Sequence, residues 1–227
     1  MPYYLDIENW SRRELYEFFI GYTNPYFNVC TQVDVTRLKE FVDQHPHAKI
    51  SLALHYFALR IANETEPFRY RIKDNKVLVY DVINGGTTVL LPNESFAYAY
   101  FDYVRSFDEF AHGMAKAVDE VRNGSGKLKP TMRDDVIYHT TLPWINFTSF
   151  SHARNSGRGE SIPRIVFGKI TNENGRLLLP FSIEVHHALV DGLHVGRYLE
   201  RLERALADPQ SFVSNEWNPH ERNQKQI

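Results

Sequence analysis

The sequence has one cysteine, Cys30, among its 227 residues, and this excludes an internal disulfide framework. It has no apolar run near the roughly 20 residues that a bilayer-spanning helix needs, and its N-terminus lacks the basic and apolar regions of a secretory signal. The formal net charge is only −2, which argues against the broad basic surface that nucleic-acid binding requires. These absences favour a protein of a reducing compartment, and we expect a cytoplasmic location.

The composition that remains is that of an ordinary globular protein, with 43% hydrophobic and 24% charged residues. Aromatic residues make up 14% of the chain, which fits either a sheet-rich core or an aromatic pocket for a flat or apolar ligand. The sequence shows no internal repeat, low-complexity tract or long linker. We therefore expect one domain at residues 1–207, followed by a polar tail at residues 208–227 that is disordered.

The hydrophobic period changes along the chain between helical and strand spacing. Helical spacing predicts helices over residues 35–42, 50–62, 107–122 and 193–206. Alternation and β-rich composition predict strands over residues 68–72, 77–80, 96–101, 136–140, 145–148, 164–170 and 177–185. The sequence therefore predicts an α/β protein of the α+β type, a two-layer sandwich in which a mixed β-sheet is flanked by helices.

Two adjacent histidines, His186 and His187, follow the last predicted strand, and Asp191 and Gly192 stand at the entrance to the final predicted helix. Histidine is the side chain best suited to take a proton from a hydroxyl near neutral pH. The pair fits satisfied core residues equally well. With Asp191 and His194 it also offers metal-ligand types, although adjacent strand residues point to opposite faces unless the strand breaks there. The residues alone leave these three interpretations open.

The segment His-His-Ala-Leu-Val-Asp-Gly-Leu-His-Val at residues 186–195 resembles the active-site signature of the chloramphenicol acetyltransferases. Three further segments resemble the family in the correct order, at residues 9–14, 142–150 and 176–180. Together they cover nearly the whole chain up to about residue 206. The resemblance implies the coenzyme-A-dependent acyltransferase fold, which is shared more distantly with dihydrolipoamide acyltransferase cores.

The resemblance also implies roles for four residues. His187 would be the general base that removes the proton from the acceptor hydroxyl as this oxygen attacks the thioester carbonyl of acetyl-CoA, without an acyl-enzyme. Ser149 would donate a hydrogen bond to the oxyanion of the tetrahedral intermediate. Asp191 would be structural and paired with Arg12. Acetyl-CoA would be a co-substrate, and we expect no tightly bound cofactor and no metal.

Binding residues and an assembly follow from the same resemblance. Phe19, Tyr26 and Phe27 lie in the segment that resembles the acceptor-binding wall, and Lys169 matches a lysine near the coenzyme A channel. Family members are homotrimers with active sites at subunit interfaces, where one subunit supplies the histidine and its neighbour much of the acceptor pocket. The expected partners are acetyl-CoA, a small hydroxylated acceptor and further copies of the chain, with no nucleic acid and no membrane.

Two positions on the acceptor side depart from the best-known members. Phe19 replaces a tyrosine and Val166 replaces a threonine, so two hydroxyls are missing. A substrate that needs such partners would lose about 1–3 kcal/mol of binding free energy. We therefore predict a chloramphenicol O-acetyltransferase with weakened acceptor binding. The alternatives are an acyltransferase of the same fold that uses a different alcohol or amine, and a binding protein that retains the fold without catalysis.

Overall fold

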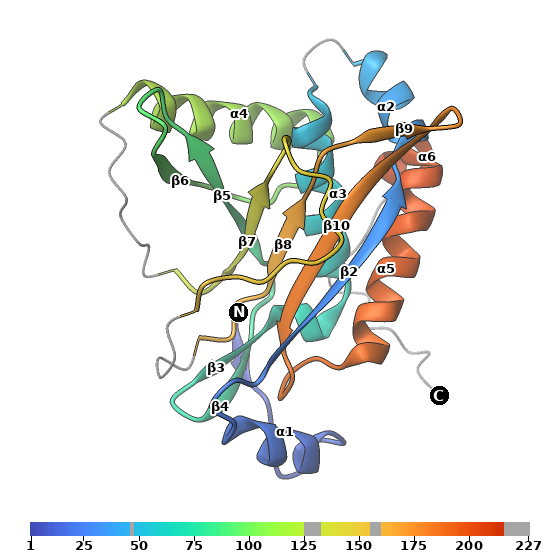
Figure 1. The fold of residues 1–227 in the computed structure, drawn as a ribbon. Helices are drawn as coiled ribbons and strands as arrows, with labels where there is room; N and C mark the ends of the chain where they lie inside the picture. Colours follow the sequence, from blue (N-terminus) through green and yellow to red (C-terminus); the bar gives the residue numbers. More distant parts are fainter. Residues whose placement is uncertain (46–47, 125–132, 155–159, 216–227) are drawn as a thin grey trace.

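The computed structural model describes residues 1–45, 48–124, 133–154 and 160–215, and Figure 1 shows their arrangement. The main sheet contains β2 (Tyr26–Asp34), β5 (Asn84–Leu90), β6 (Phe96–Phe101), β7 (Val136–Thr141), β8 (Arg164–Phe167), β9 (Thr171–Glu173) and β10 (Arg176–His186). Within the described residues its order is β2-β10-β8-β7-β5-β6, and β9 pairs with the beginning of β10. β7 runs parallel to β5 and β8, whereas the other neighbours are antiparallel. The predicted mixed sheet is confirmed.

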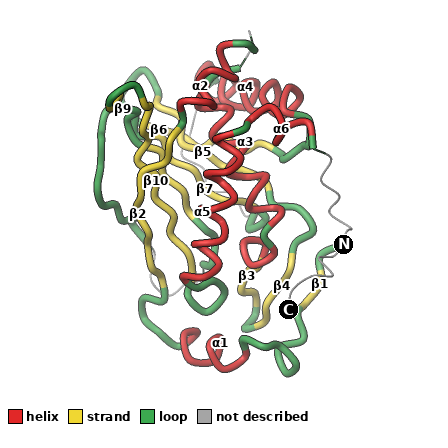
Figure 2. The backbone as a smooth tube through the Cα atoms, turned by 90° about the vertical axis from the view of Figure 1, so that its right-hand side faces the viewer, coloured by secondary structure: helices red, strands yellow, loops and turns green. Residues whose placement is uncertain are grey.

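Helices cover one face of this sheet, as the side view in Figure 2 shows. They are α2 (Thr36–Asp43), α3 (Ile50–Glu64), α4 (Phe107–Asn123), α5 (Gly192–Ala207) and α6 (Pro209–Ser214), while α1 (Arg13–Ile20) lies beyond one end of the sheet. α3 is the centre of the helix layer, because every residue from Leu52 to Asn63 is buried and both α4 and α5 pack against it. The core between the layers includes Phe57, Phe167, Phe181 and Tyr198. No helix in the described part of the chain is long and apolar enough to span a membrane.

The opposite face of the sheet is crossed by the chain that leads from β7 towards β8 (Figure 1). The Lys169 N–H donates to the carbonyl of Ile145 over 2.8 Å, and Phe147 lies against Gly168. A Cβ at Gly168 would lie 3.0 Å from both the Ile145 oxygen and a Phe147 ring carbon, so only glycine leaves room for this crossing. The strand predicted over residues 145–148 is wrong, since these residues run irregularly across the sheet and not along a ladder.

A second, three-stranded sheet packs below the first, in the order β1-β4-β3. Its strands are β1 (Tyr3–Tyr4), β3 (Tyr70–Lys73) and β4 (Lys76–Val79). A short 3₁₀ helix, η1 (Glu66–Arg69), comes directly before β3. Asp74 and Asn75 form the hairpin turn with φ values of 51° and 57°, the left-handed pair that a tight hairpin requires. The predicted hairpin is therefore confirmed, with its first two residues in η1.

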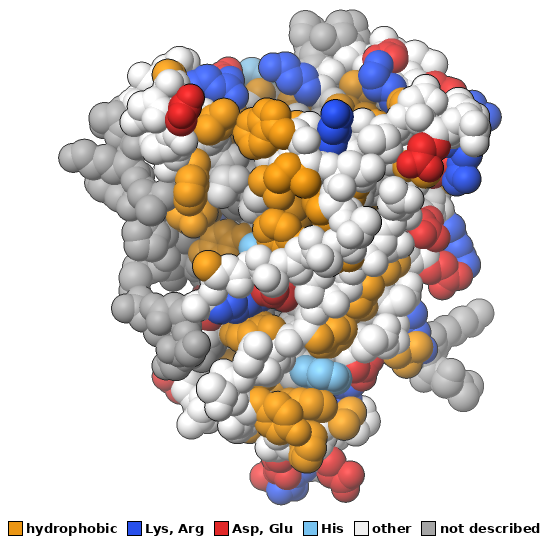
Figure 3. Space-filling view, viewed as in Figure 1, with side chains coloured by type: hydrophobic (Ala, Val, Ile, Leu, Met, Phe, Trp, Pro, Cys, Tyr) orange, Lys and Arg blue, Asp and Glu red, His pale blue; other side chains and the backbone are white. Residues whose placement is uncertain are grey.

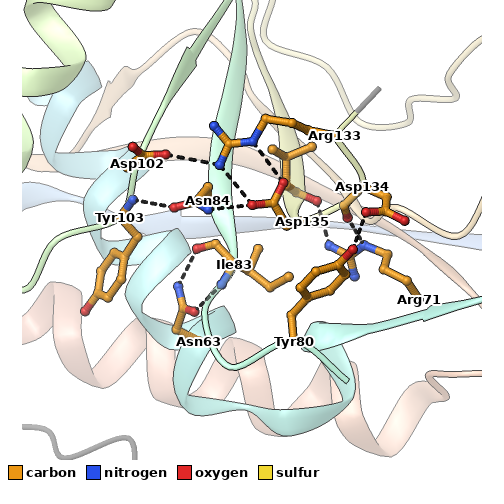
Figure 4. Close-up of polar contacts among 11 residues, drawn as sticks. Asn63, Arg71, Tyr80, Ile83, Asn84, Asp102, Tyr103, Arg133, Asp134 and Asp135 are labelled. Atoms are coloured by element: carbon orange, nitrogen blue, oxygen red, sulfur yellow. Dashed lines mark hydrogen bonds and ion pairs between the residues drawn. The ribbon is translucent and has the colours of Figure 1, made fainter. Parts of the chain in front are cut away.

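Buried polar groups join the two sheets where β5 and β7 begin (Figure 4). The guanidinium of Arg71 is 1% exposed and donates to the backbone carbonyls of Phe68, Asp134 and Val136. Burial lowers its pKa to about 10, so it still carries its charge at neutral pH. Beside it, the Asn84 amide donates to Asp135 over 2.8 Å and its oxygen accepts from a backbone N–H. This network fixes β5 and β7 relative to each other.

Two adjacent glycines on β5 make room on opposite faces of the sheet. A Cβ at Gly85 would lie 2.1 Å from the ring of Phe101 on the helix side. A Cβ at Gly86 would lie 3.0 Å from the ring of Tyr100 and 3.3 Å from that of Tyr138 on the other side. Gly85 therefore leaves space for the ring of Phe101 in the core, and Gly86 leaves space for the rings of Tyr100 and Tyr138 on the open face.

The C-terminal segment differs from its prediction. Residues 209–214, which the sequence predicts to be disordered, form α6. The Asp208 carboxylate caps this helix by accepting from the Ser211 N–H over 3.2 Å, and Arg60 donates to the carbonyls of Phe212 and Asn215. The prediction for this part of the tail is wrong because α3 supplies a buried guanidinium that ties it down. Residues 216–227 lie outside the described residues.

The other predicted elements appear with shifted ends. The predicted helices correspond to α2, α3, α4 and α5, and β6 has the predicted bounds. β8 ends at Phe167 and not at Ile170, because the backbone turns at Gly168 to meet the crossing segment. α1, β2 and β5 have no counterpart among the predicted elements.

Candidate active site

The histidine pair lies where β10 ends, and its two members have different surroundings. His186 is the last strand residue and is 4% exposed, with its ring edge-on to Tyr26 at 5.0 Å between centroids. Its Nδ1 accepts from the Ala188 N–H over 3.2 Å. Burial, with smaller effects of Arg154 and His187, lowers the pKa of His186 to about 4. His186 is therefore a neutral, buried residue of the scaffold.

His187 occupies a tight turn between β10 and α5. Its backbone N–H donates to the Pro25 carbonyl over 2.7 Å. The imidazole stacks on Phe19 with centroids 3.9 Å apart and planes 8° from parallel, and it contacts Phe27 at 4.8 Å. Its Nδ1 is buried, without a hydrogen-bond partner among the described residues. Two of the predicted acceptor-wall residues thus set the plane of the predicted base, whereas the third, Tyr26, contacts His186.

The turn is closed by Asp191 and Arg12, which form an ion pair with side chains 24% and 13% exposed. Asp191 also caps α5, because its carboxylate accepts from the N–H groups of Leu193 and His194 and its own N–H donates to His194 Nδ1. Burial alone would raise the pKa of Asp191, but the adjacent His194 and Arg12 lower it below its ordinary value. The carboxylate therefore stays charged and holds α1 against the start of α5.

A metal centre has less support than the residue types alone suggested. Asp191 and His194 are used in the helix cap, and His186 faces Tyr26. Among the residues that the structure describes, no group of three His, Cys, Asp or Glu side chains is arranged to hold an ion.

A cavity of about 520 Å³ lies on the open face of the sheet, over β5, β6 and β7. Figure 3 shows this face hollowed, with hydrophobic side chains gathered around the hollow. Its walls include Phe96, Tyr98, Tyr100, Tyr138 and Trp144, and one end is polar, with His152, Glu160 and Arg164. None of the predicted site residues lines it.

The remaining predicted residues lie near this cavity and apart from the histidine turn. Ser149 is exposed on the crossing segment, residues 142–154, whose two ends line the cavity. Val166 is fully buried on β8, in register with Thr140, a cavity-lining residue. Lys169 is exposed just after β8, where its backbone holds the crossing segment. The structure thus divides the predicted residues between two regions.

A buried ion pair that the sequence interpretation missed connects these regions. Arg154, at the end of the crossing segment, donates to Glu184 on β10 over 2.6 Å. Glu184 is 5% exposed, and although burial would raise its pKa, His152 and Arg154 lower it to about 2. The Arg154 guanidinium also lies 3.5 Å from the ring centre of Tyr26, which packs on His186. A lone acidic residue inside an apolar strand was the signal that could have revealed this pair.

Comparison with known proteins agrees with the geometry. The family model described as "Chloramphenicol acetyltransferase" matches residues 2–203. Chloramphenicol acetyltransferase 3 of Escherichia coli is 30% identical over 201 residues, covering 87% of this chain and 93% of that protein. The chloramphenicol acetyltransferase of Campylobacter coli is 29% identical over 205 residues, covering 89% and 97%.

Solved structures extend the comparison. A chloramphenicol acetyltransferase structure superimposes with a TM-score of 0.82 at 27% identity, covering 91% of this chain and all of that chain. A structure of Azotobacter vinelandii dihydrolipoamide acetyltransferase superimposes with a TM-score of 0.67 at 17% identity, covering 88% of this chain and 90% of the other, which shows a shared fold alone.

Proposed function

The chain belongs to the chloramphenicol acetyltransferase family, and we propose that it transfers acetyl from acetyl-CoA to a hydroxyl of chloramphenicol, with His187 as the general base. The observation that carries this proposal is the position of His187. Its ring is held by Phe19 and Phe27 in a turn that the Arg12–Asp191 ion pair closes. A base must be held in one orientation to meet the hydroxyl that it deprotonates.

The reaction proceeds in two steps without an acyl-enzyme. His187 takes the proton of the acceptor hydroxyl while the oxygen attacks the thioester carbonyl, and the Ser149 hydroxyl donates to the resulting oxyanion. The tetrahedral intermediate then collapses, the carbon–sulfur bond breaks, and the proton on His187 passes to the coenzyme A thiolate. Lys169, exposed beyond β8, contributes to coenzyme A binding.

The active enzyme is a homotrimer in which His187 of one subunit faces the cavity of its neighbour. The division of the site supports this proposal: His187 is absent from the cavity lining, and Ser149 lies on the segment that borders the cavity. The rim is also apolar and exposed, with Trp144 at 63%, Leu90 at 53% and Phe96 at 47%. Exposed apolar surface of this kind is typical of a subunit interface. The single cysteine fits a reducing compartment, and the use of acetyl-CoA fits the same compartment, so we propose a cytoplasmic location.

A second candidate function is the same transfer to a different alcohol or amine. The apolar side chains of Phe19 and Val166 favour it, since they offer no hydroxyl to the acceptor. Thiol release from acetyl-CoA, measured with chloramphenicol and with a panel of other alcohols and amines, separates the two. Release that depends on chloramphenicol supports the first function, whereas release with another acceptor only supports the second.

Mixed trimers test the shared site directly. His187→Ala removes the base and leaves the cavity open, whereas Gly86→Trp fills the cavity and leaves the base. Each variant alone is expected to be inactive. Co-expressed in equal amounts they should recover about a quarter of wild-type activity, since about three quarters of random trimers are mixed and each has one intact site in three.

The result distinguishes the two arrangements of the site. If base and cavity came from the same chain, no mixture would be active. Ser149→Ala offers a second partner for His187→Ala that leaves the cavity volume unchanged, in case Gly86→Trp fails to fold. Its mixture with His187→Ala should likewise exceed the activity of either variant alone.

A further inference from the structure

Four side chains form a row on the open face of the sheet that leads to the turn of His187. Glu184 and His186 are two residues apart on β10, so their side chains point to the same face. Arg154 donates to Glu184 over 2.6 Å, and its guanidinium carbon lies 3.5 Å from the ring centre of Tyr26. Tyr26 is in register with His186, and their rings meet edge to face at 5.0 Å between centroids. The row Glu184–Arg154–Tyr26–His186 is therefore continuous.

The members of the row are buried and held from more than one side. The side chains of Arg154 and Glu184 are 12% and 7% exposed. The Tyr26 hydroxyl donates to the Glu160 carbonyl, which fixes the ring against the guanidinium. A guanidinium is planar, so it can stack on a ring while it bonds to a carboxylate, whereas a lysine ammonium is a point charge. The guanidinium of Arg154 therefore sets the position of the Tyr26 ring.

The far end of the row contacts the main chain on both sides of His187. The Nδ1 of His186 accepts from the Ala188 N–H over 3.2 Å, immediately after the base. The carbonyl of Pro25, the residue before Tyr26, accepts from the His187 N–H over 2.7 Å. A shift of Tyr26 or His186 would therefore move the main chain from which the imidazole projects. Displacement of a catalytic group by about 1 Å can cost on the order of 100-fold in rate.

We propose that Arg154 and Tyr26 are positioning residues for the acetyl transfer: they act through His186 on the orientation of His187 and contact neither substrate. The inference rests on the proposed function, because it takes His187 as the base. It gives Tyr26 a role that differs from the acceptor wall that the family resemblance implies. An acceptor-wall residue acts on KM for the acceptor, whereas a positioning residue acts on kcat.

The test is the steady-state rate of thiol release, with acetyl-CoA and chloramphenicol varied separately, at a temperature where circular dichroism shows each variant folded. Arg154→Met and Tyr26→Leu should each lower kcat about ten- to a hundredfold and change both KM values less than about twofold. The double variant should lower kcat no further than either single variant, because both substitutions interrupt the same row. Tyr26→Phe keeps the ring and should recover most of the kcat that Tyr26→Leu loses.

Two further variants separate positioning from stability. Arg154→Lys keeps the charge beside Glu184 and loses the planar group on the ring, so it should recover more of the unfolding free energy than of kcat. Arg60→Met is the matched control, because Arg60 on α3 also pairs with a buried glutamate, Glu64. Its guanidinium carbon lies 4.2 Å from the ring centre of Phe212 on α6, at the far end of α5 from the turn. Arg60→Met should lower stability and leave kcat unchanged.

Each outcome has one meaning. A loss of kcat in Arg154→Met and Tyr26→Leu, with both KM values kept and Arg60→Met fully active, supports the inference. If Arg154→Met fails to fold, Arg154→Lys and Tyr26→Leu give the same reading.

Three results would overturn the inference while wild-type activity leaves the proposed function standing. They are a normal kcat in the Arg154 and Tyr26 variants, an equal loss of kcat in Arg60→Met, and a loss that lies mainly in KM for chloramphenicol. The last result would place Tyr26 in the acceptor wall. A wild-type enzyme that releases no thiol with chloramphenicol contradicts the proposed function itself.

Discussion

The turn that carries His187 and the cavity over β5–β7 are built in opposite ways. In the turn, a backbone hydrogen bond, two aromatic rings, an ion pair and a helix cap hold the imidazole within one chain. The cavity is open, aromatic and edged by exposed apolar side chains, and it contains no predicted base. The difference teaches that the orientation of His187 is fixed within one chain, whereas the cavity is bordered by apolar side chains that stay exposed in that chain.

Removing the base from the turn should have the largest effect, because it abolishes the chemistry and leaves the cavity intact. We expect His187→Ala to lower kcat on the order of 10⁴-fold, because general-base catalysis by a positioned side chain contributes up to this factor. Initial rates of thiol release measure it. The cavity should still bind the acceptor, so that its dissociation constant, measured by calorimetry, changes little. Near-normal kcat in a folded His187→Ala enzyme would show that another group is the base.

Breaking the connection between the two regions should have the next largest effect. Arg154→Met removes the guanidinium that pairs with the buried Glu184 and leaves only His152 beside it, and we expect the free energy of unfolding to fall by about 3–5 kcal/mol. Urea unfolding monitored by circular dichroism measures this loss. The paired variant Arg154→Met with Glu184→Met restores charge balance and should recover most of it. A single variant as stable as wild type would mean that the pair does not hold the crossing segment.

Ser149→Ala tests whether the segment at the cavity edge takes part in the chemistry. Loss of one donor to the oxyanion should raise the barrier by about 3–4 kcal/mol, seen in kcat with little change in KM. Thr148→Ala, its exposed neighbour, is the matched control. An equal effect of both substitutions would point to a disturbed segment and would remove Ser149 from the mechanism.

The smallest expected effect is the acid dependence of the buried pair. The pKa of Glu184 is about 2 in the folded protein and about 4.3 when unfolded, so its pairing stabilises the fold above pH 4.3 and loses this effect as the pH falls towards 2. We expect Glu184→Gln to reduce the difference in unfolding free energy between pH 5 and pH 3 by on the order of 2 kcal/mol. Urea titrations at the two pH values check it. An equal change in unfolding free energy between pH 5 and pH 3 in wild type and Glu184→Gln would argue against the depressed pKa of Glu184.

Much of the fold follows from local patterns in the sequence. The Ser106 cap begins α4, and the side chain accepts from the Glu109 N–H as expected of a capping residue. β6 has its predicted bounds because all six of its residues are aromatic or alanine, and buried positions alternate strictly with half-exposed or exposed ones. Where the local pattern is weak, prediction fails. β5 begins Asn84-Gly85-Gly86, which has low strand propensity, and it forms because β6 and β7 pair with it on both sides while its glycines leave room for their aromatic rings.

The candidate site could be predicted in part. Family resemblance identified the Arg12–Asp191 pair, and the structure brings these residues together across 179 positions of sequence. The cavity could not be predicted, since its lining comes from four strands, β5, β6, β7 and β8, and from a crossing segment in which the sequence pattern wrongly places a strand at residues 145–148. The partnership of Arg154 with Glu184 depends on the same crossing, which no local rule describes. The roles of His187, Ser149 and Lys169 remain predictions that the variants above test.

The two glycines of β5 differ in how readily evolution can replace them. A side chain at position 85 would enter the core and meet the ring of Phe101, so selection should keep glycine there in any stable descendant. A small side chain at position 86 meets only the edges of two tyrosine rings on the open face, which can shift. Mutation at this one position would reshape the cavity floor while the core stays intact. In a mutant library under antibiotic selection, position 86 should therefore be among the first to change when the acceptor changes, and position 85 among the last.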